Sequence, residues 1–328
     1  MRYREFGSTG RRVSEIGFGA WAIGGSWGDV SEDDARAALH AALDAGVNFI
    51  DTADVYGDGR SERIIAAVLA ERVGERPFVA TKVGRRISPH MAHGYTKENL
   101  ISFVERSLEN LRVDCLDLVQ LHCPPTEIFY RPDIFDIMEE LVASKKIRNY
   151  GVSVEKIEEG LKAIEYPGLA SVQIIYNIFR QRPAQLFFGE AQRKKVAVVV
   201  RVPLASGLLT GKMTKDTSFG AEDHRRFNRN GEQFDKGETF AGVPFELALE
   251  LVEEIKALLP EGVALANFAL RWVLMQAAVS TVIPGAKNAR QAQDNAEASA
   301  LTPLAPDTMQ MLRRLYEEKL AQHVHHCW

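Results

Sequence analysis

The chain has 328 residues, of which 46% are hydrophobic and 26% are charged, and its formal net charge is -4 at pH 7. This balance is typical of a globular protein and excludes a disordered or fibrous chain. Nucleic acid is not an expected partner, because the sequence lacks the concentrated positive charge that binding to a phosphate backbone requires.

The cysteines and the apolar runs bear on the cellular compartment. Cys115, Cys123 and Cys327 are too few and too scattered for a disulfide framework or a CxxC metal site. The N-terminal segment is charged from its second residue and has no signal-peptide pattern. No run approaches the roughly 20 apolar residues of a membrane span. We therefore expect a cytoplasmic protein without a membrane partner.

Short apolar runs alternate with longer segments of helical periodicity, which predicts parallel strands joined by crossover helices. Ser31 and Thr96 stand where helix N-caps are expected, and Pro132 suits a first helical turn. Periodicity alone does not distinguish a closed barrel from an open, doubly wound sheet. The predicted strands are 16–20, 47–50, 77–82, 116–121, 147–152, 171–175, 196–202 and 279–283.

The region 206–243 interrupts this alternation. It is rich in glycine, charge and phenylalanine and shows little periodicity, so we expect a long loop. Loops of this length are often functional.

Several predicted strands end in one polar residue: Asp51, Lys82, His122 and Arg201. In a (β/α)8 barrel the carboxyl ends of the strands form one rim, where residues distant in sequence converge on one site. Taken singly, Lys82 could be solvated, Asp51 could cap a turn and His122 could satisfy a backbone group. Their shared placement favours a common site.

Three motifs, DTADVYG at 51–57, ATK at 80–82 and LVQLH at 118–122, resemble signatures of the bacterial-type aldo-keto reductase family. The resemblance covers nearly the whole chain, from YREFGSTGRRVSEIGFGAW through SVQIIYN and VPLASGLLTGK to VIPGAKN. It implies an α/β fold, a (β/α)8 TIM barrel whose N-terminal β-hairpin seals the barrel bottom. We expect one domain over 1–328, with the long loop at 206–243 and a C-terminal tail at about 305–328.

The resemblance also implies a catalytic tetrad of Asp51, Tyr56, Lys82 and His122 for NADPH-dependent reduction of an aldehyde or ketone to the alcohol. Tyr56 is the expected proton donor. Because an unperturbed tyrosine with a pKa near ~10 is a weak acid, a cation must stabilise its phenolate, and Lys82 is placed to do so. Asp51 would hold the ammonium, and His122 would orient the carbonyl oxygen.

No GxGxxG lies between a strand and a helix, so a Rossmann site is unsupported. The resemblance implies instead that NADP(H) lies extended across the barrel rim. Cations after the eighth strand, without an early carboxylate, favour NADP over NAD. The implied cofactor residues are Ser153, Gln173 and Arg201 at the nicotinamide, Leu204, Ser206, Leu208, Gly211 and Lys212 at the pyrophosphate, and Gly285, Lys287, Gln291 and Asn295 after the eighth strand.

This sequence departs from the family pattern at two positions. Val154 stands where many relatives have Asn, and Arg201 stands where many have a Tyr stacked on the nicotinamide. A planar guanidinium can also stack on an aromatic ring. We hypothesise that its charge disfavours oxidised nicotinamide and favours the reduced cofactor. The stretch 204–212 has an alternative interpretation, a flexible loop with an incidental lysine.

For the substrate site we expect aromatic walls from Trp21 and Trp27, which favour an apolar carbonyl compound. Alternatively, both tryptophans only pack over the barrel mouth. Arg85 and Arg86 are expected to face solvent rather than an acidic substrate. The terminal HVHHCW contains metal-ligand types, but they are crowded at one chain end, and we expect no metal.

Two other functions stay open. The same tetrad serves a sugar or polyol dehydrogenase working towards oxidation. A nucleotide-binding, redox-sensing subunit with little turnover is the alternative outside enzymes. The substrate, its stereochemistry and the oligomeric state do not follow from the sequence.

Overall fold

A computed structural model describes residues 1–25 and 30–327. Its main sheet has eight strands in the order β10-β9-β8-β7-β6-β5-β4-β3, and all neighbouring strands are parallel. Backbone bridges from Ile16 to Val282 and from Gly19 to Gly285 join the two edges of this sheet. The sheet is therefore closed, and the predicted (β/α)8 barrel is confirmed.

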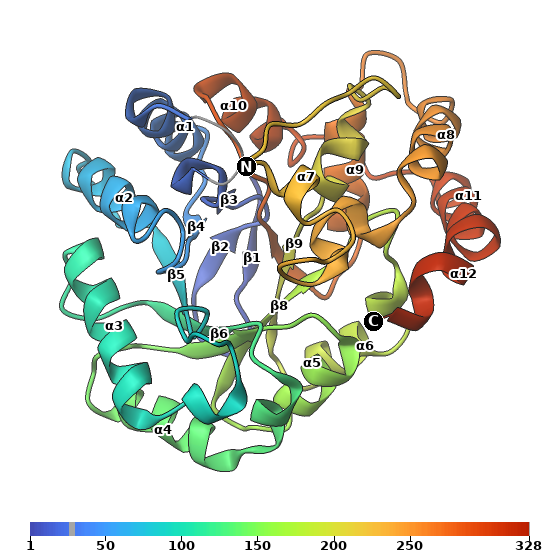
Figure 1. Cartoon of the computed structure of the whole chain (residues 1–328). Coiled ribbons are helices and arrows are strands. Elements are labelled where there is room, and N and C mark those ends of the chain that lie inside the picture. Colours follow the sequence, from blue (N-terminus) through green and yellow to red (C-terminus); the bar gives the residue numbers. More distant parts are fainter. Residues whose placement is uncertain (26–29, 328) are drawn as a thin grey trace.

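Every predicted strand overlaps an observed one. The crossover segments form an outer layer of helices around the strands (Figure 1). The strands are β3 (Phe18–Gly19), β4 (Phe49–Asp51), β5 (Phe78–Val83), β6 (Leu118–His122), β7 (Tyr150–Ser153), β8 (Leu169–Ile175), β9 (Ala197–Arg201) and β10 (Val279–Val282).

The helix starts follow the sequence signals. The Ser31 hydroxyl accepts a hydrogen bond from the Asp34 N–H at 3.0 Å, and that of Thr96 accepts from the Asn99 N–H at 3.3 Å. Pro132 is the first residue of its helix. The helices are α1 (Glu32–Asp44), α2 (Arg60–Ala70), α3 (Lys97–Leu111), α4 (Pro132–Ala143), α5 (Ile157–Ala163), α6 (Phe187–Arg193), α7 (His224–Phe227), α8 (Phe245–Lys256), α9 (Leu265–Leu274), α10 (Ala289–Glu297), α11 (Pro306–Leu315) and α12 (Ala321–Val324). Among the described residues, no helix has the length and apolar character needed to cross a membrane.

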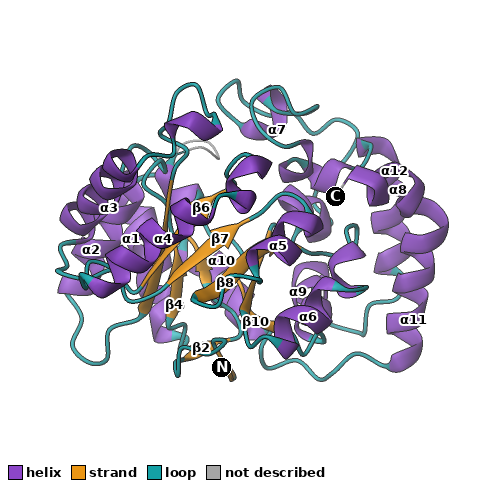
Figure 2. Cartoon of the chain, turned by 90° about the horizontal axis from the view of Figure 1, so that it is seen from below, coloured by secondary structure: helices purple, strands orange, loops and turns teal. Residues whose placement is uncertain are grey.

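An antiparallel hairpin of β1 (Tyr3–Glu5) and β2 (Arg12–Ser14) seals one end of the barrel, as predicted. It contributes the fully buried Phe6, whose ring centroid lies 5.3 Å from that of Phe49 and 5.2 Å from that of Phe78. Figure 2 shows the hairpin at the foot of the barrel and α7 at the opposite end.

The interior of the barrel changes from apolar to polar along the strands. Near the hairpin, Phe49, Ala80, Leu118 and Val199 belong to one buried apolar cluster. Alternate side chains of a strand share a face, so the residue two positions further along also points inward. Those residues are Asp51, Lys82, Gln120 and Arg201, and all are buried. The fold therefore collects polar side chains at the carboxyl ends of the strands.

The segment between β9 and α8 contains short helical turns rather than an open loop. They are η5 (Ala205–Thr210), α7, η6 (Lys236–Glu238) and η7 (Phe240–Gly242). The expected C-terminal tail is also helical. Leu312, Tyr316, Leu320 and Val324 repeat every four residues and are buried, so the tail packs against the body of the protein.

Candidate active site

Lys82 is the centre of a buried cluster at the end of β5. Its Nζ donates hydrogen bonds to Asp51 Oδ2 at 2.6 Å and to the Thr52 carbonyl oxygen at 2.9 Å. The same Nζ lies 3.4 Å from the Tyr56 hydroxyl. Lys82 is 1% exposed and Asp51 3% exposed. The structure therefore joins three members of the expected tetrad through one ammonium group.

Tyr56 reaches this cluster because the chain reverses after β4. The Tyr56 N–H donates to the Ala53 carbonyl at 3.1 Å, and Gly57 follows with a φ of 59°. A Cβ at residue 57 would collide with the carbonyl oxygen of Gly24. This left-handed, crowded position therefore needs glycine. The turn returns the phenol to Lys82.

The electrostatics of the cluster keep the phenol protonated at neutral pH. Burial raises the pKa of Tyr56 above its ordinary value, and the opposing charge of Lys82 does not overcome this effect. Burial alone would lower the pKa of Lys82, but Asp51 and Tyr56 raise it above the ordinary value, so the ammonium stays charged. The charge of Lys82 lowers the pKa of Tyr56, as expected from the sequence, but burial raises it by more.

His122, the last residue of β6, presents a neutral imidazole beside Tyr56. The two ring centroids are 5.9 Å apart, and the ring planes meet at 82°. Burial, followed by the charges of Arg85 and Lys82, holds the pKa of His122 well below its usual range. Its Nδ1 is buried and has no hydrogen-bond partner among the described residues.

A glutamine pair beneath the tetrad was not predicted. The Gln173 amide nitrogen donates to Asp51 Oδ1 at 2.6 Å and to Gln120 Oε1 at 3.0 Å. Both carboxylate oxygens of Asp51 are thus engaged, one by Lys82 and one by Gln173. Gln173 therefore positions Asp51. This role is additional to the contact with the nicotinamide that the family resemblance implies. Ser153, at the end of β7, accepts a hydrogen bond from the Cys123 thiol at 3.4 Å.

Arg201, the last residue of β9, forms a buried ion pair with Glu238 of η6. It also donates to the Val154 carbonyl oxygen at 2.9 Å. Sequence reasoning missed Glu238, because it lies in the aperiodic segment. The carboxylate balances the guanidinium charge, which weakens the repulsion of oxidised nicotinamide that we hypothesised.

Ser206 links two parts of the segment between β9 and α8 through hydrogen bonds. Its hydroxyl donates to the Glu238 carbonyl at 2.7 Å and accepts from the Phe240 N–H at 3.1 Å. Leu208, also expected at the pyrophosphate, is buried, while Leu204 and Gly211 are half-buried and Lys212 is exposed.

Trp21 forms an aromatic wall beside the tetrad. Its ring centroid lies 6.2 Å from that of Tyr56 in a stacked arrangement. His224 of α7 and Phe234 approach the same indole, with centroids 4.8 Å and 6.2 Å away. The β9–α8 segment therefore reaches across the barrel mouth to Trp21. Trp27, the other expected aromatic wall, lies outside the described residues.

The expectation that Arg85 faces solvent is wrong. Gly84, with a φ of 115°, turns the chain directly after β5, and the Arg85 side chain is only 21% exposed. Its Nη2 donates to Glu155 Oε1 at 2.9 Å. Arg86, by contrast, pairs with the exposed Asp58 at 2.6 Å.

The residues after β10 form a compact helix start. Asn288 caps α10 by accepting from the Gln291 N–H at 3.0 Å. Gln291 Oε1 accepts from the Lys287 N–H at 2.9 Å, and the Asn295 amide donates to the Gly285 carbonyl at 3.1 Å. These four cofactor candidates thus belong to one small unit.

Cationic side chains gather at this unit. Lys287 is half-buried. Burial, followed by the charge of Arg225 of α7, lowers the pKa of Lys287. Two cations near a helix N-terminus form a site that suits a phosphate group. Arg225 also binds Asp223 at 2.6 Å.

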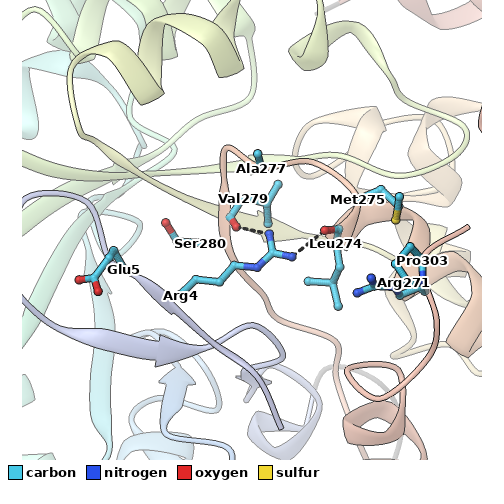
Figure 3. Close-up of a pocket in the computed structure, with 9 residues that line it drawn as sticks. All are labelled: Arg4, Glu5, Arg271, Leu274, Met275, Ala277, Val279, Ser280 and Pro303. Carbon is cyan, nitrogen blue, oxygen red and sulfur yellow. Dashed lines mark hydrogen bonds between the residues drawn. The ribbon is translucent and has the colours of Figure 1, made fainter.

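Two further features lie outside this site. Among the described residues, no group of three or more His, Cys, Asp and Glu side chains is placed to hold a metal ion. A hollow of about 480 Å³ lies at the hairpin end, where Arg4 donates to the carbonyl oxygens of Leu274 and Val279 (Figure 3). The tetrad lies at the opposite ends of the strands, so this hollow is separate from it.

The chain is similar to known proteins along almost its whole length. A family model described as "Aldo/keto reductase family" matches residues 15–317. The aldo-keto reductase YhdN of Bacillus subtilis is 31% identical over 308 residues, covering 92% of this chain and 90% of that protein. A probable voltage-gated potassium channel subunit beta of Oryza sativa is 29% identical and covers 97% of this chain and 98% of its own length. The solved glycerol dehydrogenase AKR11B4 of Gluconobacter oxydans is 30% identical with a TM-score of 0.78, covering 98% of this chain and 96% of that one.

Proposed function

Because the chain belongs to the aldo/keto reductase family of oxidoreductases, we propose that it reduces an aldehyde or ketone on a small molecule to the alcohol with NADPH. We propose Tyr56 as the proton donor. The observation that carries this proposal is the buried Lys82 ammonium, which lies between the Asp51 carboxylate and the Tyr56 hydroxyl. The proposal treats residues 1–328 as one domain.

The residues around the carbonyl each have a distinct role. NADPH, when bound, supplies the hydride. Tyr56 donates its proton to the carbonyl oxygen, and Lys82 stabilises the phenolate that remains. Asp51 keeps the ammonium charged and fixed in place. The neutral His122 orients the carbonyl oxygen through a hydrogen bond. Because the cluster is buried, these electrostatic interactions are stronger than they would be in water.

The residues at the rim suit NADP(H). Ser153 and Gln173 lie next to the tetrad and would hold the carboxamide. The buried Nε of Arg201 has no hydrogen-bond partner in the described part of the chain and is a donor available to the nicotinamide end. The remaining contacts would come from Leu204, Ser206, Leu208, Gly211 and Lys212 at the pyrophosphate, and from Gly285, Lys287, Gln291 and Asn295 near the 2′-phosphate and adenine.

Replacing Lys287 by Met should lower the affinity for NADPH roughly 10-fold and leave the affinity for NADH almost unchanged, because only NADPH carries the 2′-phosphate. Fluorescence titration of both cofactors measures the effect. Arg290→Met is the matched control, since that side chain lies in the first turn of α10, three residues further along, and is 89% exposed. An equal loss for both cofactors would refute this role of Lys287.

The proposed function is tested by following NADPH absorbance, and then NADH absorbance, with aromatic aldehydes, small ketones, dicarbonyls and keto-sugars. Turnover with NADPH and a carbonyl compound is expected. Faster turnover of glycerol or sugars with NADP⁺ would instead indicate a dehydrogenase, like the relative from Gluconobacter oxydans. Tight NADPH binding without any turnover would indicate a sensing subunit.

A further inference from the structure

The position of Arg85 distinguishes it from the other cations of the site. It follows Lys82 by three residues, and Gly84 turns it back towards the strand ends. A Cβ on Gly84 would lie 2.7 Å from the Tyr95 hydroxyl, so the turn is tight against a buried tyrosine. The guanidinium carbon of Arg85 lies 5.9 Å from the ring centroid of Phe234, which belongs to the segment across the barrel mouth.

The guanidinium of Arg85 has one N–H donor that the described part of the chain does not use. Its Nη2 is used by Glu155, but its Nε is buried and has no hydrogen-bond partner among the described residues. An unsatisfied buried donor is costly, so an acceptor that binds there would be stabilised. The fork of guanidinium N–H groups matches the two oxygens of a carboxylate.

Arg85 is close to the reacting group. After burial, its charge is the largest influence that lowers the pKa of His122, ahead of Lys82 and Arg201. Ring contacts connect the two groups: Phe234, which Arg85 approaches, lies 6.2 Å from Trp21, and Trp21 lies 6.2 Å from Tyr56, both measured between ring centroids. An anion bound to Arg85 would therefore lie at the same barrel mouth as a carbonyl group held at His122 and Tyr56.

Arg85 differs from these cations in its hydrogen-bonded partner. Lys82 is paired with the buried Asp51, and Arg201 with the buried Glu238. The partner of Arg85 is Glu155, and burial raises the pKa of that carboxyl to about 7. Burial therefore disfavours the charged form of this partner, and the charge of Glu238 also acts on Arg85.

We propose that Arg85 is a specificity-determining residue that binds a carboxylate near the carbonyl carbon, so that the substrates are short oxo acids. This proposal rests on the proposed reductase function. It changes the expectation of a wholly apolar substrate: Trp21 and Phe234 provide apolar walls, while Arg85 binds the charged end.

The test compares acids with neutral compounds of matched shape, such as 2-oxobutanoate with its methyl ester and 4-oxobutanoate with butanal. For wild-type protein we expect a higher kcat/KM for each acid. Arg85→Gln should lower kcat/KM for the acids roughly 10- to 100-fold, mostly through KM, and change it less than about threefold for the neutral compounds. Arg85→Lys should recover part of the loss. The adjacent Arg86→Gln is the control and should match wild type.

The outcomes separate this proposal from the reductase function. Turnover of neutral carbonyls without any preference for acids would overturn the role of Arg85 and leave the reductase function intact. Equal losses for acids and neutral compounds in Arg85→Gln would show a structural role and overturn it as well. If no carbonyl compound is turned over, binding of oxamate to the NADPH complex tests the role of Arg85. Binding that is lost in Arg85→Gln but kept in Arg86→Gln supports the proposal. No binding of oxamate to the wild-type protein contradicts it.

Discussion

Replacing Tyr56 by Phe is expected to lower kcat for carbonyl reduction by about 10³-fold and to leave NADPH affinity within about twofold. The variant keeps the aromatic ring beside Trp21 but loses the hydroxyl that lies 3.4 Å from Lys82 Nζ. Initial rates of NADPH consumption and a fluorescence titration of the cofactor measure the two effects separately.

The control for this variant is Tyr3→Phe. The Tyr3 hydroxyl donates to the Gly46 carbonyl at 2.9 Å at the other end of the barrel, so its loss should not affect the rate. If Tyr56→Phe kept more than about a tenth of wild-type kcat, Tyr56 would not be the proton donor.

Replacing Asp54 by Asn is expected to stabilise the protein, and more so at high pH. Asp54 is fully buried, and neither carboxylate oxygen has a hydrogen-bond partner in the described part of the chain. Burial, followed by the negative charge of Glu62, raises the pKa of Asp54 from 3.8 to about 7, although Arg86 and Arg106 oppose this rise.

The direction of the pH effect follows from linkage. The pKa of Asp54 is higher in the folded state than in the unfolded state, so the folded state binds the proton more tightly. Stability therefore falls as pH rises from about 4 to about 7, by on the order of 4 kcal/mol at most. Asn cannot ionise and avoids this loss. The variant should therefore exceed wild type by several kcal/mol at about pH 8 and by little at about pH 4 to 5.

Urea unfolding at both pH values measures the difference, and Asp216→Asn, at an exposed position, is the control. A variant that is less stable than wild type at the higher pH would contradict the account. So would a gain that is the same at both pH values.

The fold was largely predictable, because each strand of the barrel is a short apolar run and because Ser31, Thr96 and Pro132 mark the starts of three crossover helices. The gathering of Asp51, Lys82 and His122 was also predictable, since strand ends in such a barrel share one rim. Gln120, and its pairing with Gln173, could have been found by the same reasoning. Gln120 and Gln173 occupy inward-facing positions of β6 and β8, where a polar residue requires a partner.

The parts that escaped prediction depend on three-dimensional contacts between distant segments. Glu238 and Phe234 lie in a segment without periodicity, and their partners Arg201 and Trp21 are far away in sequence. The direction of Arg85 depends on the backbone conformation of Gly84, which no pattern of side chains reveals. The raised pKa of Tyr56 follows from burial, which only the packed structure shows.

The most direct test of carbonyl reduction follows the transferred hydrogen. NADPH carrying deuterium in place of both hydrogens at the nicotinamide C4 is incubated with the protein and an aldehyde, and the alcohol is analysed by mass spectrometry. We predict one deuterium on the carbinol carbon for each NADPH consumed, and almost no labelled alcohol with Tyr56→Phe. NADPH consumption that leaves the alcohol unlabelled, or bound NADPH that no carbonyl compound consumes, would contradict the account.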